Sequence, residues 1–333
     1  MNLSKRTFIV AEIGNNHEGN FNSAKKLIYT AKKCGADAVK FQTFIPDYFV
    51  SKSNIQRYKQ LEKFKLTFNQ FKKLANYSKK VGITFFSTPF DIKSAEFLNK
   101  LQKIFKIASS DNNFFPLIET VAKFNKTIFL STGLANIEQI TIAKNFILKF
   151  WKKKLKNSKK LAILHCVSSY PVIEPEANLL AIKTLKKKFS DCIIGYSDHT
   201  QGILAPVIAV TLGAKIIEKH FTLNKSFSNF RDHKISADPR EMRKMINSIR
   251  KIEVMLGNGK KQLQASEKKN IKFMRRSIVA KVNIPKGKKI EPHELNWVRL
   301  NGGLAPGNEK KIINKRTLYK IKLGEKIKLN RIK

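Results

Sequence analysis

The segment that decides the fold is AVKFQT, residues 38–43, a short apolar run that ends in polar side chains. Seven further segments have this character, and longer stretches with helical spacing of apolar residues separate them. Such nearly continuous apolar runs are typical of parallel strands that are buried on both faces and joined by crossover helices. The predicted strands are Phe8–Ile13, Ala38–Thr43, Ile83–Thr88, Ile104–Ser109, Thr127–Thr132, Ala162–Ser168, Cys192–Ser197 and Lys215–Phe221.

The helical stretches alternate with these strands. Eight βα units in succession predict an α/β fold closed into a (β/α)8 TIM barrel. A doubly wound open sheet is the alternative, but it usually has fewer strands and a glycine-rich first turn, which GNNHEGN at residues 14–20 is not. The predicted helices include Asn22–Cys34, Asn69–Lys80, Phe115–Phe124, Asn136–Lys149, Gly202–Leu212 and Pro239–Leu256.

The pattern changes after Leu256. We expect residues 1–257 to form the barrel, residues 258–275 to be a linker, and residues 276–333 to form a small β-rich domain. The last part consists of short alternating segments, among them SIVAKVNI and LYKIKLGEKIKL, separated by turns that contain glycine and proline.

The composition is strongly basic, with 66 lysines and arginines against 24 acids and a net charge of +42 over 333 residues. Residues 276–333 carry 16 basic residues against 4 acids, and the rest of the chain carries 50 against 20. Because the excess is spread along the chain and forms no single stripe, we expect no nucleic-acid partner. A positive field that attracts anionic substrates is the milder consequence.

No apolar run reaches the roughly 18 residues that a membrane span requires, and no signal-peptide pattern follows Met1. The three cysteines, Cys34, Cys166 and Cys192, lack metal or disulfide spacing. We therefore expect a cytoplasmic protein without a membrane partner.

Two lysines lie inside apolar strands, Lys40 in VKF and Lys106 in FKI. A buried ammonium needs an anionic partner. With strand-end hydroxyls and Gly133 nearby, the predicted partner is a phosphate or carboxylate of a small ligand. The alternative is that either lysine extends from the outer face of its strand into water.

His199 and His220 end consecutive predicted strands and would be neighbours around the barrel. Two adjacent imidazoles suit a divalent transition metal with open positions for water or substrate. Either histidine could instead be structural, and His17, His165 and His233 are weaker candidates.

Eight motifs carry a family resemblance: AEIGNNHEGN, AVKFQT, FFSTPFD, KIASSD, FLSTG, LHCVSSYP, GYSDHT and IIEKHFT. In this order and spacing they resemble the sialic acid (N-acetylneuraminate) synthase family, which includes the legionaminic and pseudaminic acid synthases. Residues from about 277 to the end resemble the antifreeze-like SAF domain of these enzymes.

The resemblance implies a transferase of sialic acid biosynthesis. Such enzymes condense phosphoenolpyruvate with the open-chain aldehyde of an N-acyl amino hexose, either N-acetylmannosamine or a 2,4-diacetamido-trideoxy hexose. The products are a nine-carbon 2-keto sugar acid and phosphate, which leaves by C–O cleavage.

The resemblance also implies residue roles. Glu12, Asp111 and His220 would be catalytic, and His199 and His220 would hold a metal, usually Mn²⁺, with Mg²⁺ or Co²⁺ as alternatives. Arg299 would reach the site of a partner subunit, which makes the active unit a domain-swapped homodimer. The implied substrate-binding residues are Lys40, Gln42, Thr88, Lys106, Ser109, Ser131, Ser168, Tyr170, Ser197, Asp232 and Arg299.

Two features depart from the family pattern. Asp111 stands where the sialic acid synthases usually carry Glu, and Leu300-Asn301 replaces Pro-Gly after Arg299. Both departures concern the sugar side of the implied site. Two other functions stay open: a related phosphoenolpyruvate-dependent synthase acting on a phosphorylated aldose, whose members lack the SAF tail, and a non-catalytic protein that binds carbohydrate or polyanions.

Overall fold

The computed structural model describes residues 6–151 and 160–333, and the chain divides into two compact units, Met1–Gly257 and Asn258–Lys333. Eight parallel strands of the first unit form one sheet in the order β3-β2-β1-β8-β7-β6-β5-β4. The strands are β1 (Phe8–Gly14), β2 (Ala38–Thr43), β3 (Thr84–Pro89), β4 (Ile104–Ile107), β5 (Thr127–Ser131), β6 (Leu161–Cys166), β7 (Ile193–Asp198) and β8 (Ile216–His220).

The sheet curls so that its two edge strands, β3 and β4, come into contact. No ladder joins them, and the side chain of Gln102 takes over part of that role. Its amide oxygen accepts from the backbone N–H of Ser87 at 2.7 Å, and its amide nitrogen donates to the Ser87 carbonyl at 3.0 Å. The predicted TIM barrel is confirmed, and β3 and β4 are the neighbouring strands that lack a backbone ladder.

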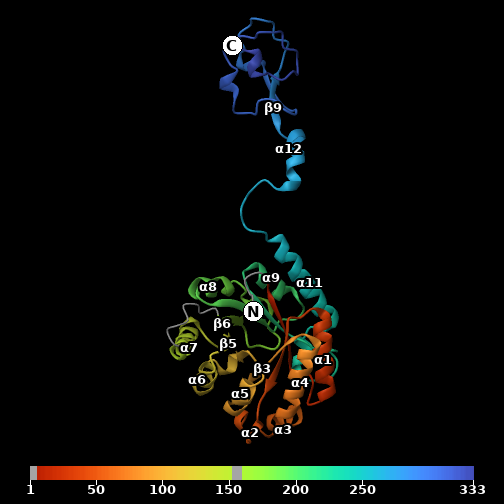
Figure 1. Cartoon of the computed structure of the whole chain (residues 1–333), viewed down its shortest axis with the longest axis vertical. Helices are drawn as coiled ribbons and strands as arrows, with labels where there is room; N and C mark the ends of the chain where they lie inside the picture. Colours follow the sequence, from red (N-terminus) through yellow and green to blue (C-terminus); the bar gives the residue numbers. More distant parts are fainter. Residues whose placement is uncertain (1–5, 152–159) are drawn as a thin grey trace. The chain divides into compact units, whose positions relative to one another are not determined.

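Helices surround the strands (Figure 1). Every helix predicted from the sequence is present within two residues of its expected ends, and the helices that were not predicted in this unit are α2, α3, α5, α8 and α10. The helices of this unit are α1 (Phe21–Cys34), α2 (Pro46–Phe49), α3 (Ile55–Phe64), α4 (Phe68–Val81), α5 (Ile92–Asn99), α6 (Phe115–Lys123), α7 (Ile137–Phe150), α8 (Ala181–Lys188), α9 (Leu204–Thr211), α10 (Arg231–Ile235) and α11 (Pro239–Met255).

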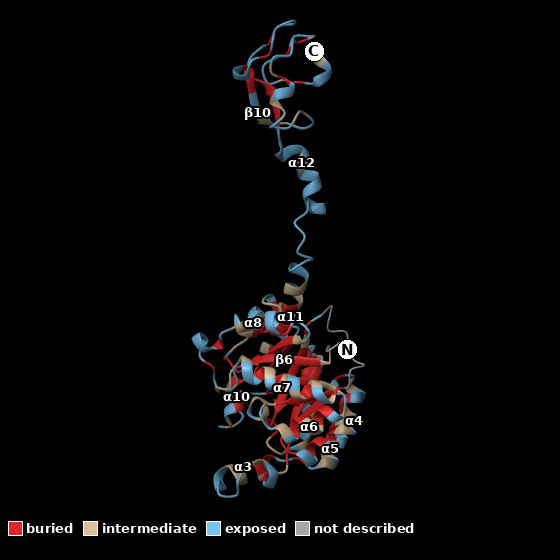
Figure 2. Cartoon of the chain, turned by 90° about the vertical axis from the view of Figure 1, so that its left-hand side faces the viewer, coloured by how far each residue is buried: buried red, intermediate tan, exposed pale blue. Residues whose placement is uncertain are grey.

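The barrel interior is built in layers, and strand alternation explains why. Residues i and i+2 of a strand point to the same face. A buried apolar cluster fills the barrel interior below the cavity. Its members are Val10, Ala38, Phe86, Ile104, Phe129, Ala162, Leu164 and Ile216. Two residues further along several strands the inward side chains become polar, as in Val10 to Glu12, Ala38 to Lys40 and Ile104 to Lys106. Figure 2 shows the buried residues gathered in the strands, inside the exposed outer faces of the helices.

The second unit begins with a short helix, α12 (Lys268–Met274), inside the segment that the sequence predicts to be a linker. An antiparallel pair follows, β9 (Arg276–Ala280) with β10 (Leu295–Arg299). The core of this small β domain is aliphatic and includes Ile278, Ile284, Ile290, Ile312, Ile321 and Ile327. Among the described residues of both units, no helix combines the length and apolarity needed to cross a bilayer.

Candidate active site

A cavity of about 300 Å³ opens at the carboxyl ends of the barrel strands. All the barrel residues predicted from the sequence line it, with the single exception of Asp111. They are Glu12, Lys40, Gln42, Thr88, Lys106, Ser109, Ser131, Ser168, Tyr170, Ser197, His199, His220 and Asp232.

The two lysines of the cavity are buried, as predicted, but each already has a carboxylate partner within the chain. Lys40 Nζ lies 2.9 Å from Glu12 Oε2 and donates to Thr88 Oγ1 at 3.0 Å. Lys106 Nζ lies 2.6 Å from Glu218 Oε1, which is also 3.7 Å from Lys40 Nζ. The sequence predicts a ligand anion as their partner, and this prediction did not include these carboxylates of the chain itself. A ligand anion would join an existing cluster.

The two glutamates of this cluster titrate in opposite directions. Burial raises the pKa of Glu12 to about 7, although Lys40 lowers it. Burial also acts to raise the pKa of Glu218, but the ammonium groups of Lys106 and Lys40 outweigh it and hold that pKa at about 2. Glu218 is thus a fixed negative charge near neutrality, whereas Glu12 exchanges a proton.

Glu218 is the main residue that the sequence analysis left without a role. It accepts hydrogen bonds from Lys106 Nζ and from Ser197 Oγ at 2.9 Å. The signal was available, because Glu218 lies two residues before His220 on the same strand and must share its face. Other lining residues without a predicted role include Asn15, Phe49, Arg57, Phe90, Phe230 and Arg231.

Hydroxyl groups form a second side of the cavity around Gly133. Ser109 Oγ accepts from the Gly133 N–H at 3.1 Å, and the Ser131 hydroxyl is buried without a partner. A Cβ at position 133 would collide with the hydroxyls of Ser168 and Ser109. Glycine is needed here because backbone and hydroxyls approach so closely, and the result is a set of short donors suited to an anion.

The imidazoles of His199 and His220 face each other with ring centroids 5.5 Å apart. His199 Nδ1 lies 2.7 Å from the Val167 carbonyl, which can only accept, so Nδ1 carries the proton and Nε2 is free to coordinate. His220 Nδ1 is buried without a partner, and burial holds its pKa well below the ordinary range. Burial acts to lower the pKa of His199, but its contacts with Cys166 outweigh burial and raise that pKa. A free nitrogen on each imidazole fits a divalent metal.

No cluster of three or more histidine, cysteine, aspartate or glutamate residues placed to hold a metal occurs in the described parts of the chain. The histidine pair therefore offers two protein ligands and leaves the other positions to water or substrate.

A charged edge borders the histidines. Arg231 lies over the Tyr170 ring, 4.5 Å from its centroid, and its Nε is 3.4 Å from Asp232 Oδ1. Asp232 is buried, and burial raises its pKa. This edge combines aromatic, cationic and carboxylate groups, a mixture that suits a polar organic substrate.

Asp111 does not line the cavity, and Arg299 belongs to the second unit. Asp111 ends a short turn (Ser109–Asp111), where burial raises its pKa to about 6. Arg299 is exposed at the end of β10 in the second unit, and Ser277 anchors the following loop by donating to the Leu300 carbonyl at 2.6 Å. Their predicted roles stay predictions, and His17, His165 and His233 are likewise absent from the lining.

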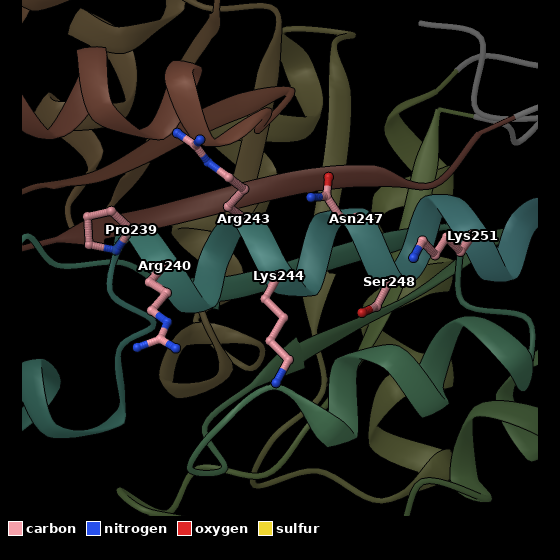
Figure 3. Close-up of a pocket in the computed structure, with 7 residues that line it drawn as sticks. All are labelled: Pro239, Arg240, Arg243, Lys244, Asn247, Ser248 and Lys251. Carbon is pink, nitrogen blue, oxygen red and sulfur yellow. The ribbon is translucent and has the colours of Figure 1, made fainter.

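A second hollow runs along α11 (Figure 3), with a volume of about 690 Å³. Its lining is Pro239, Arg240, Arg243, Lys244, Asn247, Ser248 and Lys251. It has neither a carboxylate nor an imidazole, so it lacks groups for acid–base chemistry or metal binding. The barrel cavity is the candidate active site.

Comparison with protein families agrees with this location. Residues 27–261, which include all of the lining residues named above except Glu12 and Asn15, match the NeuB family, and residues 275–333 match the SAF domain. This chain belongs to the NeuB family. The predicted resemblance and the predicted SAF domain are confirmed.

Three relatives illustrate the family. The chain is 41% identical to the N,N'-diacetyllegionaminic acid synthase of Campylobacter jejuni over 90% of this chain and 92% of the relative. It is 36% identical to the pseudaminic acid synthase of the same species, over 98% and 97%. The crystal structure of an N-acetylneuraminic acid synthetase from Leptospira borgpetersenii superposes with a TM-score of 0.74 at 37% identity, over 80% of this chain and 90% of that one. The chain is an enzyme of this NeuB type.

Proposed function

We propose that this NeuB-family enzyme is a nonulosonic acid synthase that condenses phosphoenolpyruvate with the open-chain aldehyde of an N-acyl amino hexose. The observation that carries the proposal is one cavity that joins two buried lysines, a ring of hydroxyls and a pair of coordinating histidines. The first two groups suit an anionic donor, and the histidines border the space for the acceptor.

The donor side has the charge that phosphoenolpyruvate requires. Lys40 and Lys106 bring two positive charges against the fixed negative charge of Glu218, while Glu12 is only partly ionised near its pKa of about 7. Burial lowers the pKa of Lys106, whereas the Glu12 and Glu218 carboxylates outweigh burial and raise the pKa of Lys40. The hydroxyls around Gly133, among them the unpartnered Ser131 hydroxyl, add donors for a phosphate or a carboxylate.

In the proposed reaction, C3 of phosphoenolpyruvate bonds to the aldehyde carbon, and the aldehyde oxygen takes up a proton. Water adds at C2, and phosphate leaves with cleavage of the C–O bond, so that a 2-keto acid remains. Glu12 is suited to hold a proton for the sugar oxygen because its pKa lies near neutrality. Asp111, which the family resemblance implies is catalytic, would handle the proton of the attacking water, and this role would require its side chain to turn toward the cavity.

His199 and His220 would hold a divalent cation, with Mn²⁺ as the first choice and Mg²⁺ or Co²⁺ as alternatives. When bound, it would act as a Lewis acid toward the sugar aldehyde. The fit rests on the neutral, unpartnered His220 ring and on the free Nε2 of His199.

For the acceptor we propose a 2,4-diacetamido-trideoxy hexose ahead of N-acetylmannosamine. The support is the 41% identity to a diacetyllegionaminic acid synthase. This sugar would contact Tyr170, Arg231 and Asp232, which lie beside the two histidines. The cytoplasmic location stays a prediction.

The test is phosphate release from phosphoenolpyruvate with Mn²⁺ and a panel of acceptors. The panel contains N-acetylmannosamine, both diacetamido-trideoxy hexoses, and arabinose 5-phosphate and erythrose 4-phosphate as the competing class. With oxygen-18 in the bridging position of phosphoenolpyruvate, the label should appear in the released phosphate. Turnover with only the phosphorylated aldoses, or with no acceptor at all, would overturn the proposal.

We further propose that the active unit is a homodimer in which Arg299 of one subunit contacts the sugar bound to its partner. Arg299→Ala should raise the KM for the sugar about tenfold and leave that for phosphoenolpyruvate unchanged.

A complementation experiment separates this arrangement from a role within one chain. Arg299→Ala and His220→Ala subunits, mixed and reannealed, should recover a component with the wild-type KM for the sugar, because one site of the mixed dimer has both residues intact. A chain that carries both changes, mixed with either single variant, supplies the control. No recovery in the mixed dimer would refute the exchange of Arg299 between subunits.

A further inference from the structure

A second buried ion pair lies on the opposite face of β7 and β8 from the cavity. Lys219 Nζ is 2.6 Å from Asp198 Oδ2, and both side chains are 0% exposed. Asp198 directly precedes His199 and Lys219 directly precedes His220. Because adjacent residues of a strand point to opposite faces, the histidines face the cavity while this pair points away from it.

The pair is completed by hydrogen bonds that reach the backbone beside His199. Asp198 Oδ1 accepts from the Thr200 N–H at 2.9 Å and from the Tyr196 hydroxyl at 2.8 Å. Lys219 Nζ also donates to the Thr200 carbonyl. Asp198 and Thr200, which flank His199, are therefore both bonded to Lys219, the residue before His220.

The position of the pair along the strands gives these contacts a specific consequence. The register of β7 with β8 runs through Tyr196 with Ile217 and Ser197 with Glu218, and it ends at Asp198 with Lys219. His199 lies just beyond the last paired residue of β7, where the ladder no longer fixes its distance from β8. The Asp198–Lys219 ion pair joins β7 and β8 where their backbone pairing ends.

The stability of the fold does not by itself explain why this buried pair is charged. A buried ion pair loses solvation that its mutual attraction only partly returns, and apolar residues of similar size often serve as well or better. An apolar pair would, however, lack the directed bonds to the N–H and the carbonyl of Thr200. The charged pair therefore supplies orientation, which apolar packing would not.

We propose that Asp198 and Lys219 are positioning residues that set the spacing and orientation of His199 and His220 for metal binding. The proposal rests on the proposed metal site. Outer groups that orient ligating histidines typically change metal affinity by 10–100-fold when removed.

The experiment measures metal binding directly on the full-length protein. The double variant Asp198→Asn/Lys219→Met removes both charges, leaves no unpaired charge, and keeps an acceptor oxygen at position 198. The dissociation constant for Mn²⁺ is measured from the free-ion EPR signal, the visible spectrum of bound Co²⁺ reports the ligand geometry, and calorimetry without metal gives the affinity for phosphoenolpyruvate.

We expect the double variant to bind Mn²⁺ about 10–100-fold more weakly, with a changed Co²⁺ spectrum. Affinity for phosphoenolpyruvate should stay within twofold. Ile147→Ala on α7, which opens a space in the buried apolar cluster that α7 shares with α6, is the control for lost stability. It should lower the melting temperature and leave the affinity for Mn²⁺ unchanged.

Tyr196→Phe provides a milder second variant if the double variant folds poorly. It removes one hydrogen bond to Asp198 without changing charge, and it should weaken Mn²⁺ binding about two- to fivefold. Unchanged Mn²⁺ affinity in these variants, with a wild type that binds Mn²⁺, would overturn the inference and leave the proposed function standing. A wild type that binds no divalent metal would instead refute the proposed metal site and the inference together.

Discussion

The barrel contains two buried clusters of lysine and carboxylate on opposite faces of its strands, and they differ in how completely their polar atoms are partnered. In the outward cluster, Asp198 and Lys219 are sealed from water, and both carboxylate oxygens have partners. In the inward cluster, Glu218 Oε2 has no hydrogen-bond partner and the lysines border an open cavity. A buried polar network in which every atom has a partner fixes the positions of its residues. A network beside a cavity that still has an unpartnered atom can bind a ligand.

The largest effect on stability should come from breaking the sealed pair on one side only. Lys219→Met leaves Asp198 charged and buried, which should lower the free energy of unfolding by about 3–5 kcal/mol. Urea unfolding followed by Trp151 fluorescence measures this, in a Trp297→Phe background that leaves a single tryptophan. Lys123→Met, which breaks an exposed i,i+4 pair with Glu119, is the control and should change little. Equal losses in the two variants would remove the distinction between sealed and exposed pairs.

The corresponding change in the open cluster should affect function more than stability. Lys106→Met removes a donor to the proposed phosphoenolpyruvate, so kcat/KM for that substrate should fall about 10²–10³-fold, or about 3–4 kcal/mol. The loss of stability should be smaller than for Lys219→Met, because water in the cavity can reach Glu218. Initial-rate kinetics and the same urea assay compare the two. A variant that loses stability but keeps its kcat/KM would place Lys106 among the structural residues.

The two glutamates of the open cluster should give opposite pH dependences of stability. The pKa of Glu218 falls from 4.5 to about 2 on folding, so its contribution is present above pH 4.5 and is lost as the pH falls toward 2. The pKa of Glu12 rises from 4.5 to about 7, so the folded state loses stability as the pH rises through that window. Glu218→Gln should thus destabilise the protein at pH 8 by roughly 3 kcal/mol, and Glu12→Gln should stabilise it by a similar amount.

Urea unfolding of both glutamine variants at pH 4 to 8 tests these signs. The difference between Glu12→Gln and wild type should vanish near pH 4, where Glu12 is protonated in both states. A Glu12→Gln variant that is less stable than wild type at pH 8 would contradict the raised pKa.

The smallest of these effects concerns the hydroxyl side of the cavity. In Gly133→Ala the new methyl group meets the Ser109 and Ser168 hydroxyls, which should displace them and raise the KM for phosphoenolpyruvate about tenfold, or about 1.4 kcal/mol. The KM for the sugar should not change. An equal rise in both KM values would show a general distortion of the barrel mouth.

Much of the fold was predictable because strands and helices in a barrel repeat a local pattern. Near-continuous apolar runs identified all eight strands, and polar residues at their ends identified the mouth of the barrel. The helix α12 inside the predicted linker was missed because its seven residues carry no buried side chain, so no apolar period marks it. Helix α8 was missed because it is short and rich in lysine.

The site was predictable as a set of positions but not as a set of contacts. Lys40 and Lys106 were identified as buried because each interrupts an apolar strand. Their partners were not identified, since Glu12 and Glu218 come from other strands. Glu12 meets Lys40 when β1 pairs with β2, and Glu218 meets Lys106 across the barrel. Glu218 is 112 residues from Lys106, and no local rule relates them.

The sequence by itself determined the alternation within each strand, and thereby which side chains enter the barrel and which layer they occupy. The reason is that strand geometry is local and has a period of two residues. Tertiary structure alone decided that Glu218 joins both lysines, that Glu12 holds a proton near neutral pH, and that Asp198 and Lys219 lie behind the two histidines. These outcomes depend on distances between strands and on burial, which exist only once eight distant segments have closed around one axis.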